Sequence, residues 1–234
     1  MILSASNNLT KKRIAIVGRE KQTVNYQKAL DFFSLRYEVT LSTGNLSGFD
    51  ALLLPGGGDI DPVLISEPDM GSKNIDRELD ILQFQALDLF VKSKKPILGI
   101  CKGFQLIELY FGASLIQDLP LPSLHPVQEN GADSLHFVHC RPLSCARTEH
   151  SFSSPDFPEK VLVNSAHHQG IQKNGRQLYP FQEAEDGITE GVCHETLPIL
   201  AFQWHPERML LSEDRKLQQT GQLAFTFFLS LLSV

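Results

Sequence analysis

A cysteine flanked by two glycines is the strongest chemical feature of this 234-residue sequence. Cys101 follows the apolar run 96–100 and stands between Gly99 and Gly103, in the pattern G-x-C-x-G. Where a strand turns sharply into a helix, such glycines leave room for an exposed nucleophile, and the free N–H groups at the helix start favour its thiolate form. A small cysteine buried in a core strand would fit the same residues. The pattern therefore predicts a nucleophile at Cys101 and leaves the structural alternative open.

A histidine and a carboxylate later in the chain could complete a catalytic triad. His205 follows the strand-like run 199–203, and Glu207 comes two residues later. Alternate side chains of an extended chain share a face, so Glu207 could hold one imidazole nitrogen while the other nitrogen faces a thiol. A lone histidine beside Trp204 would more often be structural. The presence of Cys101 together with His205 and Glu207 favours a catalytic triad of these three residues.

Three consecutive glycines, Gly56 to Gly58, directly follow the predicted strand 49–54. Glycine lets the backbone present its N–H groups to a bound oxygen, although a tight turn without a ligand would use the same residues. The spacing is not that of a phosphate-binding loop. Since a tetrahedral intermediate needs two donors near one oxygen, we expect an oxyanion hole formed by the backbone amides of Gly57 and Lys102.

The elements that must position these residues can be predicted from the hydrophobic pattern. Short apolar runs predict strands, and apolar residues recurring every three to four positions predict helices. The strands are expected at 14–18, 37–41, 49–54, 96–100, 134–140, 161–163, 179–183, 188–193 and 199–203, and the helices at 22–33, 76–92, 103–111 and 213–232. Residues 120–158 are rich in Pro, Ser and His and are expected to form excursions around a site. Strands that alternate with helices indicate an α/β fold with a mostly parallel sheet.

Composition and charge exclude several other classes of protein. A net charge of -6 and the lack of any basic cluster beyond residues 11–13 argue against nucleic-acid binding. No run of about 18 apolar residues and no secretory leader is found, so we expect a cytoplasmic protein that does not bind membranes. The four scattered cysteines are typical of reduced thiols. The length fits one domain over residues 1–234, with its core at about 13–234.

Three motifs together resemble the class I glutamine amidotransferase family. They are residues 99–105 around Cys101, the loop 54–58, and residues 203–207, and they occur in the order of that family. Five further segments, at 58–62, 76–80, 117–119, 164–169 and 186–190, are more similar to the branch of γ-glutamyl hydrolases and γ-glutamyl-γ-aminobutyrate hydrolases. The resemblance covers the chain from about residue 14 onward.

The resemblance implies a flavodoxin-like core with helices on both faces of the sheet, a covalent γ-glutamyl thioester on Cys101, and no cofactor. It also implies which residues bind the substrate. These are Gly56, Gln105, Asn164, Ser165 and His167. His136, His139 and Cys140 lack the full spacing of a zinc site, so no metal is expected.

The sequence departs from the family at three places. Lys102 follows the nucleophile where such hydrolases usually carry Arg, and residues 112–114 and 65–67 also differ from the usual motifs. These departures affect the identity of the substrate more than they affect the triad.

The expected function is cysteine-dependent hydrolysis of γ-glutamyl amide bonds in small molecules, which releases glutamate and an amine. One alternative is a glutaminase subunit that supplies ammonia to a synthetase partner. Another is a catalytically silent binding or sensor protein of the same fold, which the presence of Cys101, His205 and Glu207 disfavours. The identity of the amine stays open, and a homodimer is compatible with the sequence.

Overall fold

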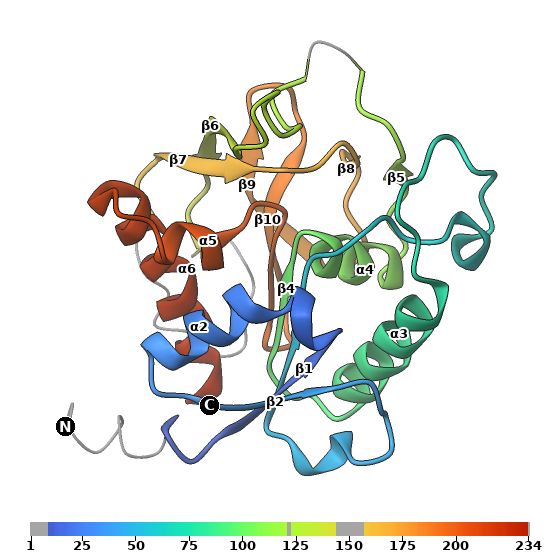
Figure 1. The fold of residues 1–234 in the computed structure, drawn as a ribbon, viewed down its shortest axis with the longest axis vertical. Coiled ribbons are helices and arrows are strands. Elements are labelled where there is room, and N and C mark those ends of the chain that lie inside the picture. The colour runs from blue at the N-terminus through green and yellow to red at the C-terminus, as the bar shows by residue number, and fades with distance from the viewer. Residues whose placement is uncertain (1–8, 121–122, 144–156, 234) are drawn as a thin grey trace.

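A nine-stranded sheet organises the protein (Figure 1), whose computed structural model describes residues 9–120, 123–143 and 157–233. The strand order is β2-β1-β3-β4-β11-β10-β9-β6-β7, and β5 and β8 form a separate pair. The strands are β1 (Arg13–Val17), β2 (Arg36–Thr40), β3 (Ala51–Leu54), β4 (Ile97–Ile100), β5 (Leu115–Ile116), β6 (Ser134–Cys140), β7 (Lys160–Ser165), β8 (Gly170–Ile171), β9 (Leu178–Ala184), β10 (Thr189–His194) and β11 (Ile199–Phe202).

Helices cover both faces of the sheet (Figure 1). They are α2 (Val24–Phe32), α3 (Arg77–Lys92), α4 (Lys102–Tyr110), α5 (Pro206–Leu210) and α6 (Arg215–Leu232), with single 3₁₀ turns η1 (Glu20–Gln22), η2 (Leu46–Gly48) and η3 (Pro62–Ile65). The two longest helices begin at aspartate caps: Asp76 accepts from the Leu79 N–H, and Asp214 accepts from the Lys216 N–H. No helix in the described ranges combines the length and hydropathy that crossing a membrane requires.

The sheet has a parallel half and an antiparallel half. Strands β2, β1, β3, β4 and β11 pair in parallel, as the alternation of strands and helices predicts. Strands β10, β9, β6 and β7 extend the sheet by antiparallel pairing. No helix separates β9, β10 and β11 in the chain, and short loops can join only antiparallel neighbours, because parallel strands need a long crossover.

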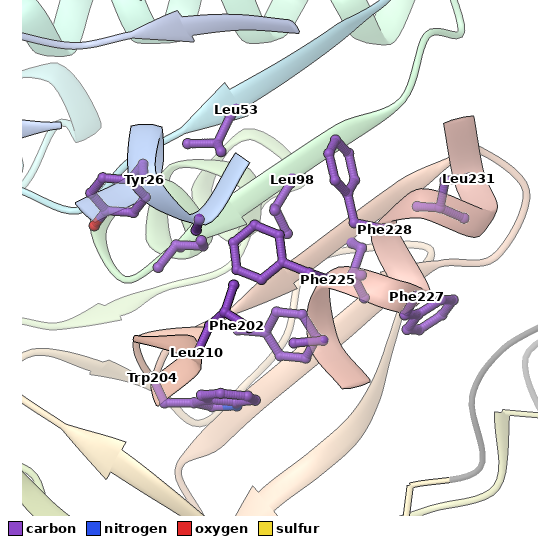
Figure 2. Packing of buried hydrophobic residues seen from close by; sticks show 14 of the residues in the cluster. Tyr26, Leu53, Leu98, Phe202, Trp204, Leu210, Phe225, Phe227, Phe228 and Leu231 are labelled. Atoms are coloured by element: carbon purple, nitrogen blue, oxygen red, sulfur yellow. The ribbon is translucent and has the colours of Figure 1, made fainter. Parts of the chain in front are cut away.

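Alternate residues of the parallel strands bury into two different cores. Ile14 and Ile16 of β1 pack in the core that includes α2, α5 and α6, whereas Ala15 and Val17 pack in the core that includes α3 and α4. Figure 2 shows the first core, where aromatic rings of α6 lie beside side chains of β3, β4 and β11. The labelled residues include Leu53, Leu98, Phe202, Phe225 and Phe228. Two buried faces explain why these strands are apolar throughout.

The turn from β4 into α4 depends on its two glycines. A Cβ atom on Gly103 would lie 2.1 Å from the backbone oxygen of Leu54, and one on Gly99 would lie 2.6 Å from the backbone oxygen of Gly103. Cys101, between them, has φ 54° and ψ -106°, a conformation that costs about 1–3 kcal/mol in a non-glycine residue. The sharp strand-to-helix turn expected from the G-x-C-x-G pattern is therefore present.

The expected strands and helices agree with the structure to within two residues at each end. The structure also contains elements that the sequence does not predict: the three 3₁₀ turns, the two-residue strands β5 and β8, and the short helix α5. Each is too short to show a periodic hydrophobic pattern, and α5 begins directly after His205 with Pro206 at its first position.

We expect Gly103→Ala to destabilise the protein by about 3 kcal/mol or more, because backbone at Leu54 cannot make room for the added methyl group. Gly48→Ala is the matched control. A Cβ on Gly48 meets nothing within 4 Å, so its free energy of unfolding should change by no more than about 0.5 kcal/mol. Urea unfolding of both variants measures the difference. Equal stability of the two variants would show that the close approach of α4 to β3 is not a constraint.

Candidate active site

Three loops that carry the expected site residues begin at one edge of the sheet. Strands β3, β4 and β11 are parallel neighbours, so their carboxyl ends lie together. The loop with Gly56 and Gly57 leaves β3, Cys101 leaves β4, and His205 follows β11. In open α/β sheets, ligands bind outside the carboxyl ends of the parallel strands. The topology therefore gathers Gly56, Cys101 and His205, although long stretches of sequence separate them.

Cys101, His205 and Glu207 have the arrangement that nucleophilic catalysis requires. Glu207 Oε1 lies 2.8 Å from His205 Nδ1, and both side chains are buried. A Cβ placed on Gly56 would lie 3.2 Å from Cys101 Cβ and also 3.2 Å from His205 Cε1, which shows that the thiol and the imidazole flank the same glycine. Because Glu207 accepts a hydrogen bond, Nδ1 of His205 is the donor nitrogen. The other ring nitrogen, Nε2, is then left to exchange a proton with a reacting group.

The charges around His205 favour its protonated form. Burial alone lowers the pKa of His205, but the neighbouring Glu207 and Cys101 outweigh it and raise the pKa to about 10. His205 is therefore an imidazolium at neutral pH. A cation beside a cysteine at the start of a helix is the environment in which reactive cysteines are found.

Tyr26 of α2 orients the glycine loop beside the nucleophile. Its hydroxyl accepts a hydrogen bond of 2.8 Å from the Gly56 N–H. The pKa of Tyr26 is raised well above its usual value by burial and by the charges of Glu207 and Cys101, so the hydroxyl stays neutral. Because its N–H is occupied, Gly56 borders the site without offering that donor to a ligand, and its contact with a substrate stays a prediction.

Two backbone amides stay available for an oxyanion. Lys102 is the first residue of α4, so its N–H has no acceptor within the helix. The loop amide of Gly57 donates to no backbone acceptor in the described residues. Gly57 also lies against the Lys102 side chain, since a Cβ there would be 3.7 Å from Lys102 Nζ. Gly57 is therefore a neighbour of the Lys102 side chain, and an oxyanion hole formed by the two backbone amides stays a prediction.

The Lys102 side chain turns away from solvent into a buried ion pair. Its ammonium lies 2.6 Å from Asp80 of α3, and both side chains are at most 2% exposed. Asp80 also accepts from the Asp61 N–H at 2.9 Å, so both carboxylate oxygens have partners. Removing one member of such a pair costs about 3–5 kcal/mol, because the other charge is left buried. Lys102 therefore ties the start of α4 to α3.

Asn164 holds the backbone of His205. Its Oδ1 accepts from the His205 N–H at 3.0 Å, and its Nδ2 donates to Asp133 at 2.8 Å. Asp133 also pairs with Arg208, which lies 3.7 Å from Glu207. The sequence suggested that Asn164 contacts substrate. Because both polar groups of its side chain have protein partners, we propose instead that it positions His205.

The remaining expected binding residues are buried. The Ser165 hydroxyl donates to the backbone oxygen of His125 at 3.0 Å, and His167 Nδ1 lies 2.8 Å from the backbone oxygen of Gln169. Burial lowers the pKa of His167 to about 3, so this ring is neutral. The amide nitrogen of Gln105 donates to Gln203 at 3.1 Å. In this structure these three side chains make contacts inside the protein, and their contact with a substrate stays a prediction.

Sequence reasoning missed four residues that organise the site: Tyr26, Asp80, Asp133 and Arg208. Two of them had a signal. Asp80 ends the segment 76–80 that resembles the family, and Arg208 is adjacent to Glu207. Tyr26 and Asp133 act through contacts between distant segments, which single-sequence patterns do not report.

We expect Cys101 to be alkylated faster than Cys140 and Cys193 at neutral pH, because it faces the His205 imidazolium. Burial raises the pKa of Cys140 and raises that of Cys193 to about 12, which disfavours both thiolates. Exposure alone would make Cys140 react faster than Cys101, because Cys140 is the more exposed of the two. Timed iodoacetamide labelling with peptide mass spectrometry checks the order. Cys145 lies outside the described residues.

The matched variant is His205→Ala, which removes the cation and should slow labelling of Cys101 by at least about tenfold. Faster labelling of Cys140 than of Cys101 in the unmodified protein would contradict the assignment of an activated thiol.

Comparisons with known proteins identify the family of this chain. The sequence pattern of the peptidase C26 family matches residues 34–207. The glutamine amidotransferase-like protein YvdE of Lactococcus lactis subsp. lactis is 32% identical over 161 residues, which are 68% of this chain and 66% of that protein. The γ-glutamyl-CDP-amidate hydrolase of Campylobacter jejuni is 28% identical over 158 residues, which are 68% of this chain and 62% of the relative. The matches thus span slightly less than two thirds of each relative.

Among solved structures, a glutamine amidotransferase of Thermotoga maritima has the same fold, with a TM-score of 0.61 over 95% of both chains at 15% identity. The expected α/β fold, with helices on both faces of a sheet built on parallel strands, is confirmed. Since the family pattern covers most of the sequence and includes Cys101, His205 and Glu207, the chain belongs to the peptidase C26 family of class I glutamine amidotransferase-like proteins.

Proposed function

We propose that this protein, acting as one hydrolase domain, cleaves γ-glutamyl amide bonds of small molecules with Cys101 as nucleophile. The observation that carries the proposal is the strained Cys101 at the start of α4, beside a buried His205 that Glu207 holds at 2.8 Å. Membership of a peptidase family supports hydrolysis, and the name of the Campylobacter relative supports a γ-glutamyl substrate. No step of the proposed reaction needs a cofactor.

In the first half of the reaction, the Cys101 thiolate attacks the side-chain carbonyl carbon of the γ-glutamyl group. The carbonyl oxygen becomes an oxyanion, which the Gly57 and Lys102 amides stabilise by hydrogen bonds. The tetrahedral intermediate then collapses, and His205 gives its proton to the leaving amine. The products of this half are a free amine and a γ-glutamyl thioester on Cys101.

In the second half, water cleaves the thioester. His205 is now neutral and takes a proton from the attacking water, while Glu207 stabilises the imidazolium that forms. Collapse of the second tetrahedral intermediate releases glutamate and restores the thiolate and imidazolium pair. Each proton that His205 gives in the first half is thus recovered in the second.

A γ-glutamyl group differs chemically from an α-linked glutamate. It carries a free α-ammonium and a free α-carboxylate near the scissile bond, and a site that pairs with both rejects an α-peptide. Each buried polar group left without a partner costs about 1–3 kcal/mol, so several together discriminate by orders of magnitude. We therefore expect strict selection of the glutamyl side and tolerance of different amines.

Glutamine is itself a γ-glutamyl amide, so the same triad could serve an ammonia-supplying subunit. The likeness in fold to a glutamine amidotransferase favours this second candidate. It predicts hydrolysis of glutamine that increases when a synthetase partner is added, and little turnover of larger γ-glutamyl amines. A silent binding protein would turn over neither.

The test supplies matched pairs, γ-Glu-X and α-Glu-X, to the purified chain and measures free glutamate. We expect cleavage of the γ-linked compounds at a rate at least about 100-fold above that of the α-linked compounds. Cys101→Ala should abolish release, and Cys140→Ala should leave it unchanged as the matched thiol control.

Comparable cleavage of both linkages would overturn the γ-glutamyl assignment. Cleavage of glutamine alone would favour the ammonia-supplying subunit. Full activity of Cys101→Ala would rule out the thiol mechanism altogether.

A further inference from the structure

A second cluster of titratable side chains lies behind the catalytic histidine. It consists of His125 in the loop before β6, His136 on β6, His167 after β7 and Glu190 on β10. All four are buried, and His125 and Glu190 have no exposed surface. Glu190 adjoins the active site through its backbone, since its oxygen accepts from the N–H of Gln203, two residues before His205. None of the four side chains takes part in the covalent steps of the proposed hydrolysis.

The strand directions explain why these residues meet. In the antiparallel half of the sheet, the start of β6, the end of β7 and the start of β10 lie at the same edge. Ser134 at the start of β6 pairs with Ser165 at the end of β7, for example. The sequence could not reveal the cluster, because its members are separated by up to 65 positions.

The three histidines converge on one carboxylate oxygen of Glu190. Glu190 Oε1 lies 3.3 Å from His125 Nδ1, 3.7 Å from His136 Nε2 and 3.5 Å from His167 Nε2. Ligands around a tetrahedral zinc ion with bonds of about 2.0–2.1 Å are separated by about 3.3 Å. The polar atoms of His125, His136 and Glu190 all lie within 4.8 Å of one another. The spacing therefore suits coordination of one ion.

Two of the histidines direct a lone pair at Glu190. His125 Nε2 lies 3.0 Å from Asp186, and His167 Nδ1 lies 2.8 Å from the backbone oxygen of Gln169. Both partners are acceptors, so those nitrogens carry the hydrogen, and the opposite nitrogens face Glu190 as acceptors. A histidine that donates its outer N–H to a carboxylate or a backbone carbonyl is typical of metal ligands.

Most of the polar atoms that meet in the cluster have no hydrogen-bond partner among the described residues. Both oxygens of Glu190, both nitrogens of His136 and Nε2 of His167 are buried without a hydrogen-bond partner in the described residues. The Ser165 hydroxyl lies 3.4 Å from His125 Nδ1, but its single hydrogen is directed to the closer backbone oxygen at 3.0 Å. A proton on Glu190 would satisfy one of these acceptors at a time. A divalent cation would satisfy Glu190 Oε1, His136 Nε2 and His167 Nε2 at the same time.

We propose that His125, His136, His167 and Glu190 form a zinc-binding site. Three imidazole nitrogens and one carboxylate oxygen suit zinc, and four protein ligands leave no open position, as in structural sites. The ion would join β6, β10 and the segment after β7, and so stabilise the strand end from which Asn164 holds His205. The sequence grouped His136 with His139 and Cys140 instead, but His139 lies on the exposed face of β6.

The test measures zinc content in the Cys101→Ala background, so that the active-site thiol cannot bind the ion. The protein is incubated with zinc, desalted and analysed by plasma mass spectrometry. We expect about one zinc per chain, and a loss of at least about tenfold in Glu190→Gln and in His136→Ala. His139→Ala is the matched control on the same strand and should keep its zinc.

A second measurement does not depend on the folding of the variants. Cobalt bound to the Cys101→Ala protein should give the intense visible absorption of a four-coordinate ion, without a thiolate charge-transfer band. A well-folded protein that holds no zinc, equal zinc in Glu190→Gln, or a cobalt spectrum of six-coordinate or thiolate type would overturn the proposal.

Discussion

The close approach of α4 to β3 is the constraint on which the rest of the site depends. Gly103 at the first turn of α4 contacts the backbone of Leu54, where even a methyl group would lie 2.1 Å from the carbonyl oxygen. This contact draws the helix onto the sheet and forces Cys101 to a positive φ. The loop after β3 lies beside Cys101, since a Cβ on Gly56 would be 3.2 Å from Cys101 Cβ, and Gly57 lies against the Lys102 side chain. The strain at Cys101 is offset by the two cores that pack the strands from both sides.

The second half of the site is held from the antiparallel strands. His205 comes from the parallel strand β11, but its backbone is fixed by Asn164 at the end of β7. Asp133 before β6 joins Asn164 to Arg208, and Arg208 lies near Glu207. The extension of the sheet therefore contributes to the geometry of the histidine and the acid, whereas the parallel half supplies the nucleophile. The proposed zinc site lies in that extension and would stabilise it further.

The sequence predicts the parts of the structure that depend on local patterns. Strand and helix positions follow from hydrophobic periodicity, and the turn at Cys101 follows from its two glycines. The antiparallel direction of β10, β9, β6 and β7 could have been inferred, because no helix separates the later strands. Tyr26 and Asp133 could not have been found, because each acts through a partner at least 30 positions away. Glu190 had a signal as the last residue of the segment 186–190, but the sequence did not indicate its histidine partners. Asn164 also acts across a long separation, because its Oδ1 accepts from the His205 N–H, while its expected contact with a substrate stays a prediction.

The central claim is that Cys101 becomes covalently attached to a γ-glutamyl group during turnover, and trapping that intermediate tests it most directly. The protein is mixed with a reactive γ-glutamyl ester or amide, quenched in acid within the first turnovers, digested and analysed by mass spectrometry. The account predicts one glutamyl group on the peptide that contains Cys101. The adduct should be cleaved by hydroxylamine, as a thioester is, and should be absent in Cys101→Ala. Release of glutamate at full rate with no adduct at any quench time, or an adduct on Cys140 or Cys193 instead, would contradict the account.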